Sequence, residues 1–192
     1  MAKPAERRCR TIVVGVGYAG SKIVSLLMNM GITGADCIAV DTDIQSLNTV
    51  HATHKVVIGG EITQGLGAGG SPAVGRTAIK ESKKRLGNLL KDRDIAFVVA
   101  GLGGGTGTGA APIVAGIARR KGASVIGVVT TPLKAEKRRI EYAAHGLAEM
   151  RKNCDTVIVI DNKKLVESAP QLPLGEALRV VNQVSANTIK EI

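Results

Sequence analysis

The fold is decided by the stretch TIVVGVGYAG, at residues 11–20. Its first part is apolar and mostly β-branched, as expected of a strand that is buried on both faces. It passes directly into the pattern G-x-G-x-x-G, formed by Gly15, Gly17 and Gly20, and helical periodicity follows over residues 21–30. Glycines let the backbone turn tightly, and a helix N-terminus offers free N–H groups and the positive end of its dipole. The stretch therefore predicts a strand, a phosphate-binding turn and a helix, in that order.

The same alternation of strand and helix runs along the rest of the chain. Short apolar runs typical of buried strands recur at residues 37–40, 55–58, 95–100, 124–130 and 156–160. Helical periodicity recurs at residues 75–91, 110–121, 136–152 and 175–192. This order predicts an α/β fold: a Rossmann-like three-layer sandwich in which a mostly parallel six-stranded sheet carries helices on both faces. Such sheets bind ligands beyond the carboxyl ends of their strands, so functional residues are expected in the loops that follow strands.

Composition narrows the class of protein. The chain has 192 residues, 44% of them hydrophobic, which suits one domain with a full core and excludes general disorder. No apolar run reaches the roughly 18 residues that span a bilayer, and residues 1–10 lack the apolar centre of a secretion signal. Three widely spaced cysteines predict reduced thiols and a cytoplasmic location. The chain has three aromatic residues, which makes nucleic acid an unlikely partner. The net charge of +10 lies in separate basic clusters, which fit either solvated surfaces or contact with another anionic partner.

The first glycine turn on its own favours a dinucleotide. Asp41 ends the second predicted strand 21 residues after Gly20, a spacing that suits a carboxylate bound to a ribose hydroxyl. On this interpretation the chain is an NAD(P)-binding oxidoreductase domain. The alternative without a ligand is a glycine turn that lets a helix pack closely on a strand.

A second glycine-rich loop favours a different ligand. Residues 101–109 read GLGGGTGTG and follow a predicted strand, and six of the nine are glycine. Ordering so many glycines costs backbone entropy, which suits a continuous wrap around a di- or triphosphate better than a simple turn. Thr106 and Thr108 add hydroxyl donors, and each hydrogen bond to a charged phosphate contributes roughly 1.5–3 kcal/mol. No lysine follows the glycines, so the pattern differs from the phosphate loop G-x-x-x-x-G-K-[ST].

This second loop also resembles a known family signature. Residues 101–112, GLGGGTGTGAAP, closely resemble the tubulin-like signature of FtsZ, a family of cell-division GTPases. Segments that resemble further family loops follow the family's order, at residues 39–47, 63–76, 128–139 and 157–165. The resemblance implies a cytoskeletal GTPase that assembles into filaments with GTP, through contacts with its own copies or with a full-length homologue. Its domains would be a basic segment at residues 1–10, a GTP-binding domain at 11–174 and the start of a central helix at 175–192.

The resemblance implies a contact for each part of a GTP or GDP molecule, with Mg²⁺ held on the phosphates rather than by protein side chains. The phosphates would contact Gly15, Gly17, Gly20 and Ser21, then Gly67, Ala68, Gly69 and Gly70, and then Gly101, Gly103, Gly104, Gly105, Thr106, Gly107 and Thr108. The ribose side of the nucleotide would lie near Pro132, Glu136 and Arg139. The guanine edge would bind Asn162 and Asn182.

Several positions depart from the family pattern. Asp41 replaces a common Asn, and Leu178 stands where an aromatic side chain usually stacks on guanine. Lys22 replaces another Asn, and it either contacts a phosphate or points into solvent. Tyr18 replaces a Gly, and it either partly covers the nucleotide or packs on its helix.

The family pattern also implies residues beyond this sequence. After the central helix the family continues into a loop with acidic residues and a second domain, and those acids act on the GTP of a neighbouring subunit. The sequence ends at Ile192, so we expect it to contain no catalytic residue. The chain would bind GTP or GDP, and alone it would hydrolyse GTP slowly or not at all. A nucleotide-insensitive subunit that caps filaments is a further alternative.

Overall fold

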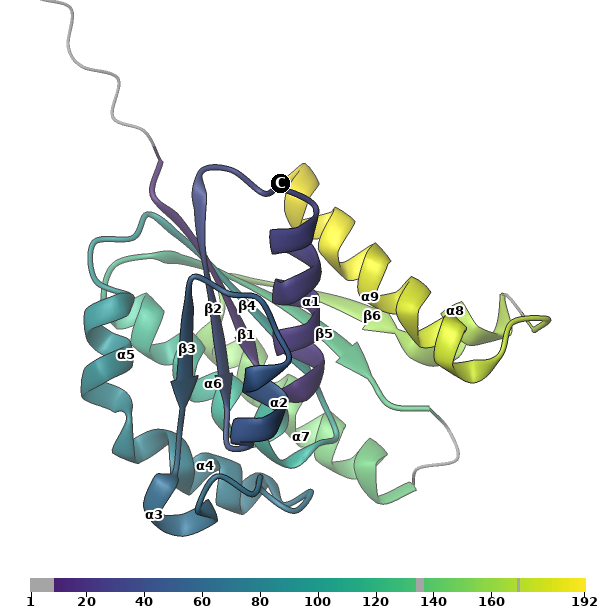
Figure 1. Cartoon of the computed structure of the whole chain (residues 1–192), viewed down its shortest axis with the longest axis horizontal. Coiled ribbons are helices and arrows are strands. Elements are labelled where there is room, and N and C mark those ends of the chain that lie inside the picture. The colour runs from purple at the N-terminus through teal and green to yellow at the C-terminus, as the bar shows by residue number, and fades with distance from the viewer. Residues whose placement is uncertain (1–8, 134–136, 169) are drawn as a thin grey trace, which may run out of the picture.

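A parallel β-sheet forms the middle layer of the molecule (Figure 1). The computed structural model describes residues 9–133, 137–168 and 170–192. Within these ranges the sheet has six strands in the order β3-β2-β1-β4-β5-β6, and all neighbouring strands are parallel. The strands are β1 (Thr11–Val16), β2 (Ala35–Asp41), β3 (His54–Val57), β4 (Ile95–Gly101), β5 (Ser124–Thr131) and β6 (Thr156–Asp161). The predicted six-stranded α/β sheet is confirmed, and it is entirely rather than mostly parallel.

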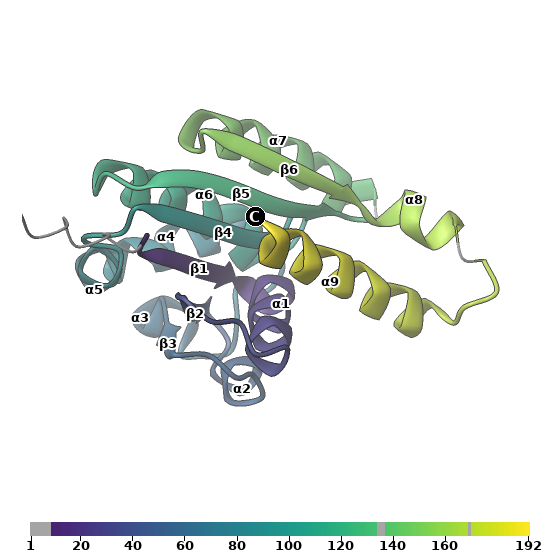
Figure 2. The same ribbon diagram turned by 90° about the horizontal axis from the view of Figure 1, so that it is seen from above.

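Helices cover both faces of this sheet. One face carries α1 (Gly17–Asn29) and α9 (Leu174–Glu191), which lie side by side (Figure 1, Figure 2). The other face carries α4 (Pro72–Glu81), α5 (Lys83–Leu89), α6 (Gly105–Arg120) and α7 (Lys137–Asn153). Successive side chains of a strand point to opposite faces, so Val13 packs in the core below α1 and α9 while Val14 packs in the core below α6. The continuous apolar runs of the sequence therefore serve two cores at once.

The strand order brings the two glycine turns together. Strands β2 and β3 lie in succession on one side of β1, and β4, which follows them in the sequence, lies on the other side of β1. Val16, at the end of β1, lies opposite Ala100 of β4. The helices that follow these strands, α1 and α6, leave toward opposite faces of the sheet. This point, at which the strand order reverses, is where open parallel sheets bind ligands.

The helices differ from the prediction more than the strands do. Both α1 and α6 begin inside their glycine motifs, at Gly17 and Gly105, instead of after them. The single helix expected at residues 75–91 is divided at Ser82 into α4 and α5. The short helices α2 (Ile44–Asn48), α3 (Gly60–Thr63) and α8 (Asn162–Glu167) were not predicted.

Two of these short helices begin at a carboxylate cap. Asp43 accepts a hydrogen bond from the backbone N–H of Gln45 (2.8 Å) ahead of α2. Asp161 accepts one from the N–H of Lys163 (3.0 Å) at the start of α8. Aspartate is a preferred N-cap because its side chain satisfies an N–H group that has no partner within the helix. Both caps lie at the carboxyl edge of the sheet, so they shape the loops there.

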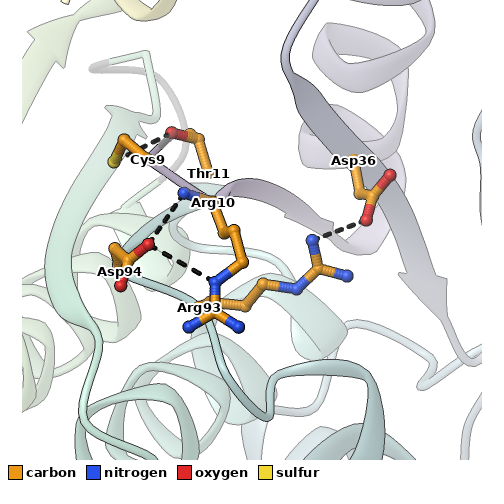
Figure 3. A network of polar contacts seen from close by, with 6 residues as sticks. All are labelled: Cys9, Arg10, Thr11, Asp36, Arg93 and Asp94. Atoms are coloured by element: carbon orange, nitrogen blue, oxygen red, sulfur yellow. Dashed lines mark hydrogen bonds and ion pairs between the residues drawn. The ribbon is translucent and has the colours of Figure 1, made fainter. Parts of the chain in front are cut away.

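Polar contacts fasten the opposite, amino edge of the sheet (Figure 3). The backbone N–H of Arg10 donates to Oδ2 of Asp94 (2.8 Å), which joins the residues just before β1 and β4. Nη1 of Arg93 lies 2.6 Å from Oδ2 of Asp36, at the start of β2. Partly exposed ion pairs contribute at most about 1 kcal/mol, so these contacts add little to the stability that the core provides.

Candidate functional site

A cavity of about 640 Å³ opens at the carboxyl ends of β1, β2, β4 and β5. Its volume is typical of a small-molecule site, and it lies at the switch point of the sheet. Most of the predicted site residues that the structure describes line it: Gly17, Lys22, Asp41, Gly67, Gly101, Gly104, Gly105, Thr106, Gly107, Pro132, Arg139, Asn162, Leu178 and Asn182. Glu136 lies outside the described residues.

The glycines of the first turn have two different roles: one lines the cavity, and two allow close packing of the helix on the sheet. Gly17 lines the cavity with a φ of +73°, a left-handed conformation that favours glycine. Gly15 and Gly20 are buried beside it. A Cβ on Gly15 would collide with the carbonyl oxygen of Gly20, and one on Gly20 would collide with that of Val99. These two glycines therefore let α1 pack closely on β1 and β4. Ser21 is 1% exposed, and its hydroxyl has no hydrogen-bond partner among the described residues.

The second glycine turn places the N-terminus of α6 at the cavity. Gly104 is the N-cap of this 16-residue helix, and Gly105, Thr106 and Gly107 form its first turn. All four residues line the cavity. The N–H groups of a first helical turn have no partners within the helix, and the helix dipole adds positive potential there. This end of α6 can therefore bind an anion such as a phosphate.

Other residues of the same loop serve packing instead. A Cβ on Gly109 would lie 2.6 Å from the backbone nitrogen of Arg76, so glycine at this position lets α4 approach α6. Thr108 is 4% exposed, and its Oγ1 accepts a hydrogen bond from the N–H of Gly103 (2.8 Å). The Thr108 hydroxyl thus braces the turn from inside the protein, and Thr108 does not line the main cavity.

A carboxyl group and two hydroxyls meet where β2 ends. Asp41 is 3% exposed, and burial raises the pKa of its carboxyl more than hydrogen bonds from Thr42 and Thr106 lower it. The N–H of Thr42 donates to Oδ1 of Asp41 (2.7 Å), and the hydroxyls of Thr42 and Thr106 lie 2.7 Å apart. Thr42 therefore ties the end of β2 to the first turn of α6. Thr42 was not among the predicted site residues, although its place directly after Asp41, at the end of a predicted strand, was an available signal.

On the β6 side, α8 and α9 close the cavity. Asn162 begins α8, and its Oδ1 is buried with no hydrogen-bond partner among the described residues. Leu178 and Asn182 lie one turn apart on α9 and line the same cavity. A buried acceptor without a partner costs about 1–3 kcal/mol, so a ligand that brings a donor to Asn162 would be favoured.

A second cavity, of about 590 Å³, adjoins the first beside α6 and shares Arg139 with it. The predicted contacts that line this second cavity and not the first are Gly69, Gly70 and Gly103. Ala68 is buried against the start of α6. The contact is close, because a Cβ on Gly105 would lie 2.8 Å from the Cβ of Ala68.

Lys22 lines the main cavity, but its ammonium group contacts protein groups. Its Nζ donates to Oγ1 of Thr49 (3.1 Å) and lies 5.4 Å from the centre of the Tyr18 ring, within the range of a cation–π contact. Tyr18 is 62% exposed. Lys22 thus joins α1 to the end of α2, an arrangement that neither of the two sequence-based alternatives describes.

Comparison with known proteins identifies the family. Residues 10–170 match the family model described as "Tubulin/FtsZ family, GTPase domain". The chain belongs to the tubulin/FtsZ family. The cell division protein FtsZ 2 of Methanocaldococcus jannaschii is 48% identical over 183 residues, which cover 95% of this chain and 48% of that protein. The cell division protein FtsZ 1 of Pyrococcus furiosus is 48% identical over 186 residues, which cover 96% of this chain and 50% of that protein.

Solved structures from the tubulin/FtsZ family have the same fold. An empty FtsZ dimer of M. jannaschii matches with a TM-score of 0.93 and 42% identity, covering 97% of this chain and 55% of that chain. CetZ2 of Haloferax volcanii, solved as a GTPγS-bound protofilament, matches with a TM-score of 0.84 and 27% identity, covering 94% and 57%. The chain therefore spans about half the length of the relatives that it matches.

Residues 9–133, 137–168 and 170–192 contain neither a cluster of metal ligands nor a helix that could span a membrane. No three His, Cys, Asp or Glu side chains there come together as ligands of a metal ion would. No helix in those ranges combines the length and the apolar character needed to cross a bilayer.

Proposed function

We propose that this chain is the guanine-nucleotide-binding domain of an FtsZ-like cytoskeletal GTPase of cell division. The observation that carries the proposal is one cavity lined both by the N-terminus of α6 and by Asn162, whose buried Oδ1 has no partner in the described residues. The helix N-terminus suits phosphates. The free acceptor of Asn162 suits guanine, which carries a ring N–H and an amino group on one edge, whereas adenine presents an acceptor at that ring position.

The names of the relatives support the same function. FtsZ 1 and FtsZ 2 are cell division proteins, and the CetZ2 structure is a protofilament with GTPγS bound. Because one of these relatives was solved as a protofilament, we propose that this chain joins a filament of its own copies or of a full-length homologue. An NAD(P)-binding oxidoreductase domain draws no support from these relatives. A cytoplasmic location is part of the proposal, and it rests on three cysteines that are all unpaired.

We expect different residues of the cavity to contact different parts of the nucleotide. The phosphates would lie against the first turn of α6 and beside Gly17 and Gly67, and the guanine would lie beside Asn162 and Asn182. Mg²⁺ would be held by phosphate oxygens and water, a coordination that this ion commonly has at nucleotide phosphates. When bound, the ion would neutralise phosphate charge and orient the terminal phosphate.

A titration with fluorescent GDP, with GTP, ATP and NADH as competitors, tests this proposal. We expect GTP to compete with GDP, and ATP and NADH to fail. Asn162→Ala should weaken GDP binding by roughly 5- to 150-fold, the equivalent of about 1–3 kcal/mol. Asn88→Ala is the matched control, since Asn88 is exposed on α5 and lines neither cavity. Equal affinity for ATP and GTP, or no binding of any nucleotide, would contradict the proposal.

Hydrolysis is a separate part of the proposal. The family pattern places the catalytic acids in the half of the relatives that this chain does not match, so we expect slow GTP turnover by the isolated chain. Phosphate release would be measured for the chain alone and in mixtures with a full-length homologue. Release by the chain alone at the rate of the homologue would refute this part. The filament-capping alternative predicts a different result. Substoichiometric amounts of this chain would inhibit the assembly of the homologue, and the inhibition would not depend on nucleotide bound to this chain.

A further inference from the structure

The end of β2 carries a buried carboxyl group beside the place proposed for the phosphates. Asp41 is 3% exposed and lines the same cavity as the first turn of α6. Its Oδ1 accepts the N–H of Thr42 (2.7 Å), and the hydroxyl of Thr42 lies 2.7 Å from that of Thr106. Because Thr106 belongs to the first turn of α6 and lines the same cavity, the carboxyl lies beside the place proposed for the phosphates.

The charged groups around this carboxyl do not neutralise it. Those that line the cavity are Lys22 from α1, Arg139 from α7 and Asp43 from the residues ahead of α2. Lys22 directs its ammonium to Thr49 and Tyr18, and Asp41 forms no ion pair within the described ranges.

Asp43 differs from Asp41 although both are carboxylates of the same cavity. Asp43 accepts hydrogen bonds from the N–H groups of Ser46 (3.2 Å) and Gln45 (2.8 Å), and these bonds lower the pKa of its carboxyl. Asp41 is buried, and burial raises the pKa of its carboxyl. Of the two, Asp41 is therefore the group that more readily holds a proton.

A bound di- or triphosphate would place several negative charges beside Asp41, and one Mg²⁺ would neutralise only part of them. Two unit charges about 5 Å apart, at an effective dielectric constant of about 20, weaken binding by a factor of roughly 100 or more. A proton on the carboxyl removes this repulsion and leaves a hydroxyl that can donate to a phosphate oxygen.

We propose that Asp41 makes nucleotide binding proton-coupled: its carboxylate takes up one proton from solvent as the phosphates bind at the first turn of α6. The inference rests on the proposed function, and it identifies Asp41 as the residue that sets how affinity depends on pH. An asparagine at this position offers a neutral amide of the same shape, so binding to an Asp41→Asn variant would require no proton at this position.

The sign of the effect follows from linkage. The complex favours the protonated carboxyl, so affinity is highest at pH values below the pKa of Asp41 in the free protein. Above it, affinity falls by about tenfold per pH unit until the carboxyl stays ionised in the complex as well. The phosphates of GDP also titrate in this range, and their titration affects the Kd of both proteins equally. The ratio of the wild-type Kd to the D41N Kd therefore reports only the pH dependence that Asp41 contributes.

The experiment is a titration of wild-type and D41N protein with fluorescent GDP from about pH 5.5 to about pH 8.5 at saturating Mg²⁺. We expect the Kd ratio to rise with pH, by up to about tenfold per pH unit, until the Asp41 carboxyl stays ionised in the complex as well. Calorimetry in buffers of different ionisation enthalpy should show about one more proton taken up by the wild type. Asp43→Asn is the matched control: the Asp43 carboxyl caps α2 and is ionised throughout, so the variant should keep the wild-type slope. Its curve should move to lower pH, because the charge of Asp43 contributes to the raised pKa of Asp41.

Four outcomes would overturn the inference, the last of them together with the proposed function. A Kd ratio that is constant with pH excludes coupled proton uptake. A D41N variant that differs from the wild type only in the Mg²⁺ concentration it requires would show that a cation neutralises the carboxylate. Weaker binding by D41N at every pH would show that the carboxylate accepts from the nucleotide, for example from a ribose hydroxyl. If melting curves show both proteins folded and neither binds GDP at any pH, the proposed function fails first, and this inference fails with it.

Discussion

Replacing Thr108 with valine tests how the second glycine turn is held. Oγ1 of Thr108 accepts the N–H of Gly103 at 2.8 Å, and both residues are buried. Valine keeps the shape of the side chain and removes the acceptor, so the N–H of Gly103 is left buried without a partner. Such a loss costs about 1–3 kcal/mol. In a domain of this size each 1 kcal/mol shifts Tm by about 2–4 °C, so we expect a fall of about 2–12 °C.

The assay is thermal and urea unfolding of the nucleotide-free protein, followed by GDP titration. Thr108→Ser is the control, because serine keeps the hydroxyl that accepts from Gly103 and loses only a methyl group packed against Gly146. Serine should therefore retain more stability than valine does. If Thr108→Val melts at the wild-type temperature and yet no longer binds GDP, the hydroxyl contacts the ligand, and the bracing role is wrong.

Two further predictions concern packing and thiol chemistry. Gly20→Ala should lower the free energy of unfolding by about 1–3 kcal/mol in urea, because its Cβ would overlap the backbone of β4, whereas Gly175→Ala meets open space and should cost nothing. Burial is the main cause that raises the pKa of Cys37 and of Cys154 to about 11, so both thiols stay protonated at pH 8. A thiol reagent should then modify the exposed Cys9 alone in the native protein, and a second modified thiol before unfolding would contradict this reasoning.

The four central strands could be predicted from the sequence because they are mostly buried on both faces, and the edge strands β3 and β6 are short apolar runs although they are partly exposed. A strand that is buried on both faces is a short continuous apolar run. The helix starts could not be predicted in the same way. Gly105 and Gly107 have low helical propensity, and the apolar periodicity that marks α6 begins only after them. Tertiary packing of α6 against β4 and α4 overrides that local preference.

The location of the site followed from motif order, whereas the roles of its side chains required coordinates. Glycine turns after the first and fourth strands predict a shared ligand site, since parallel strands end at one edge. Nothing in the sequence shows that Thr108 points inward to Gly103, or that Lys22 reaches across to Thr49. Those contacts join segments that only the fold brings together.

The glycines of the two turns cannot be assigned to ligand binding alone, because several meet two demands at once. Gly105 lines the cavity, and a Cβ on it would lie 2.8 Å from both the Cβ of Ala68 and the backbone nitrogen of Ser71. Gly107 also lines the cavity, and a Cβ on it would lie 2.5 Å from the carbonyl oxygen of Gly101. Substituting either glycine would displace the helix and the ligand together, so lost binding would not reveal a direct contact. Side chains that reach the cavity without bracing a helix start, Asn162 above all, are therefore the positions at which binding can be tested separately from folding.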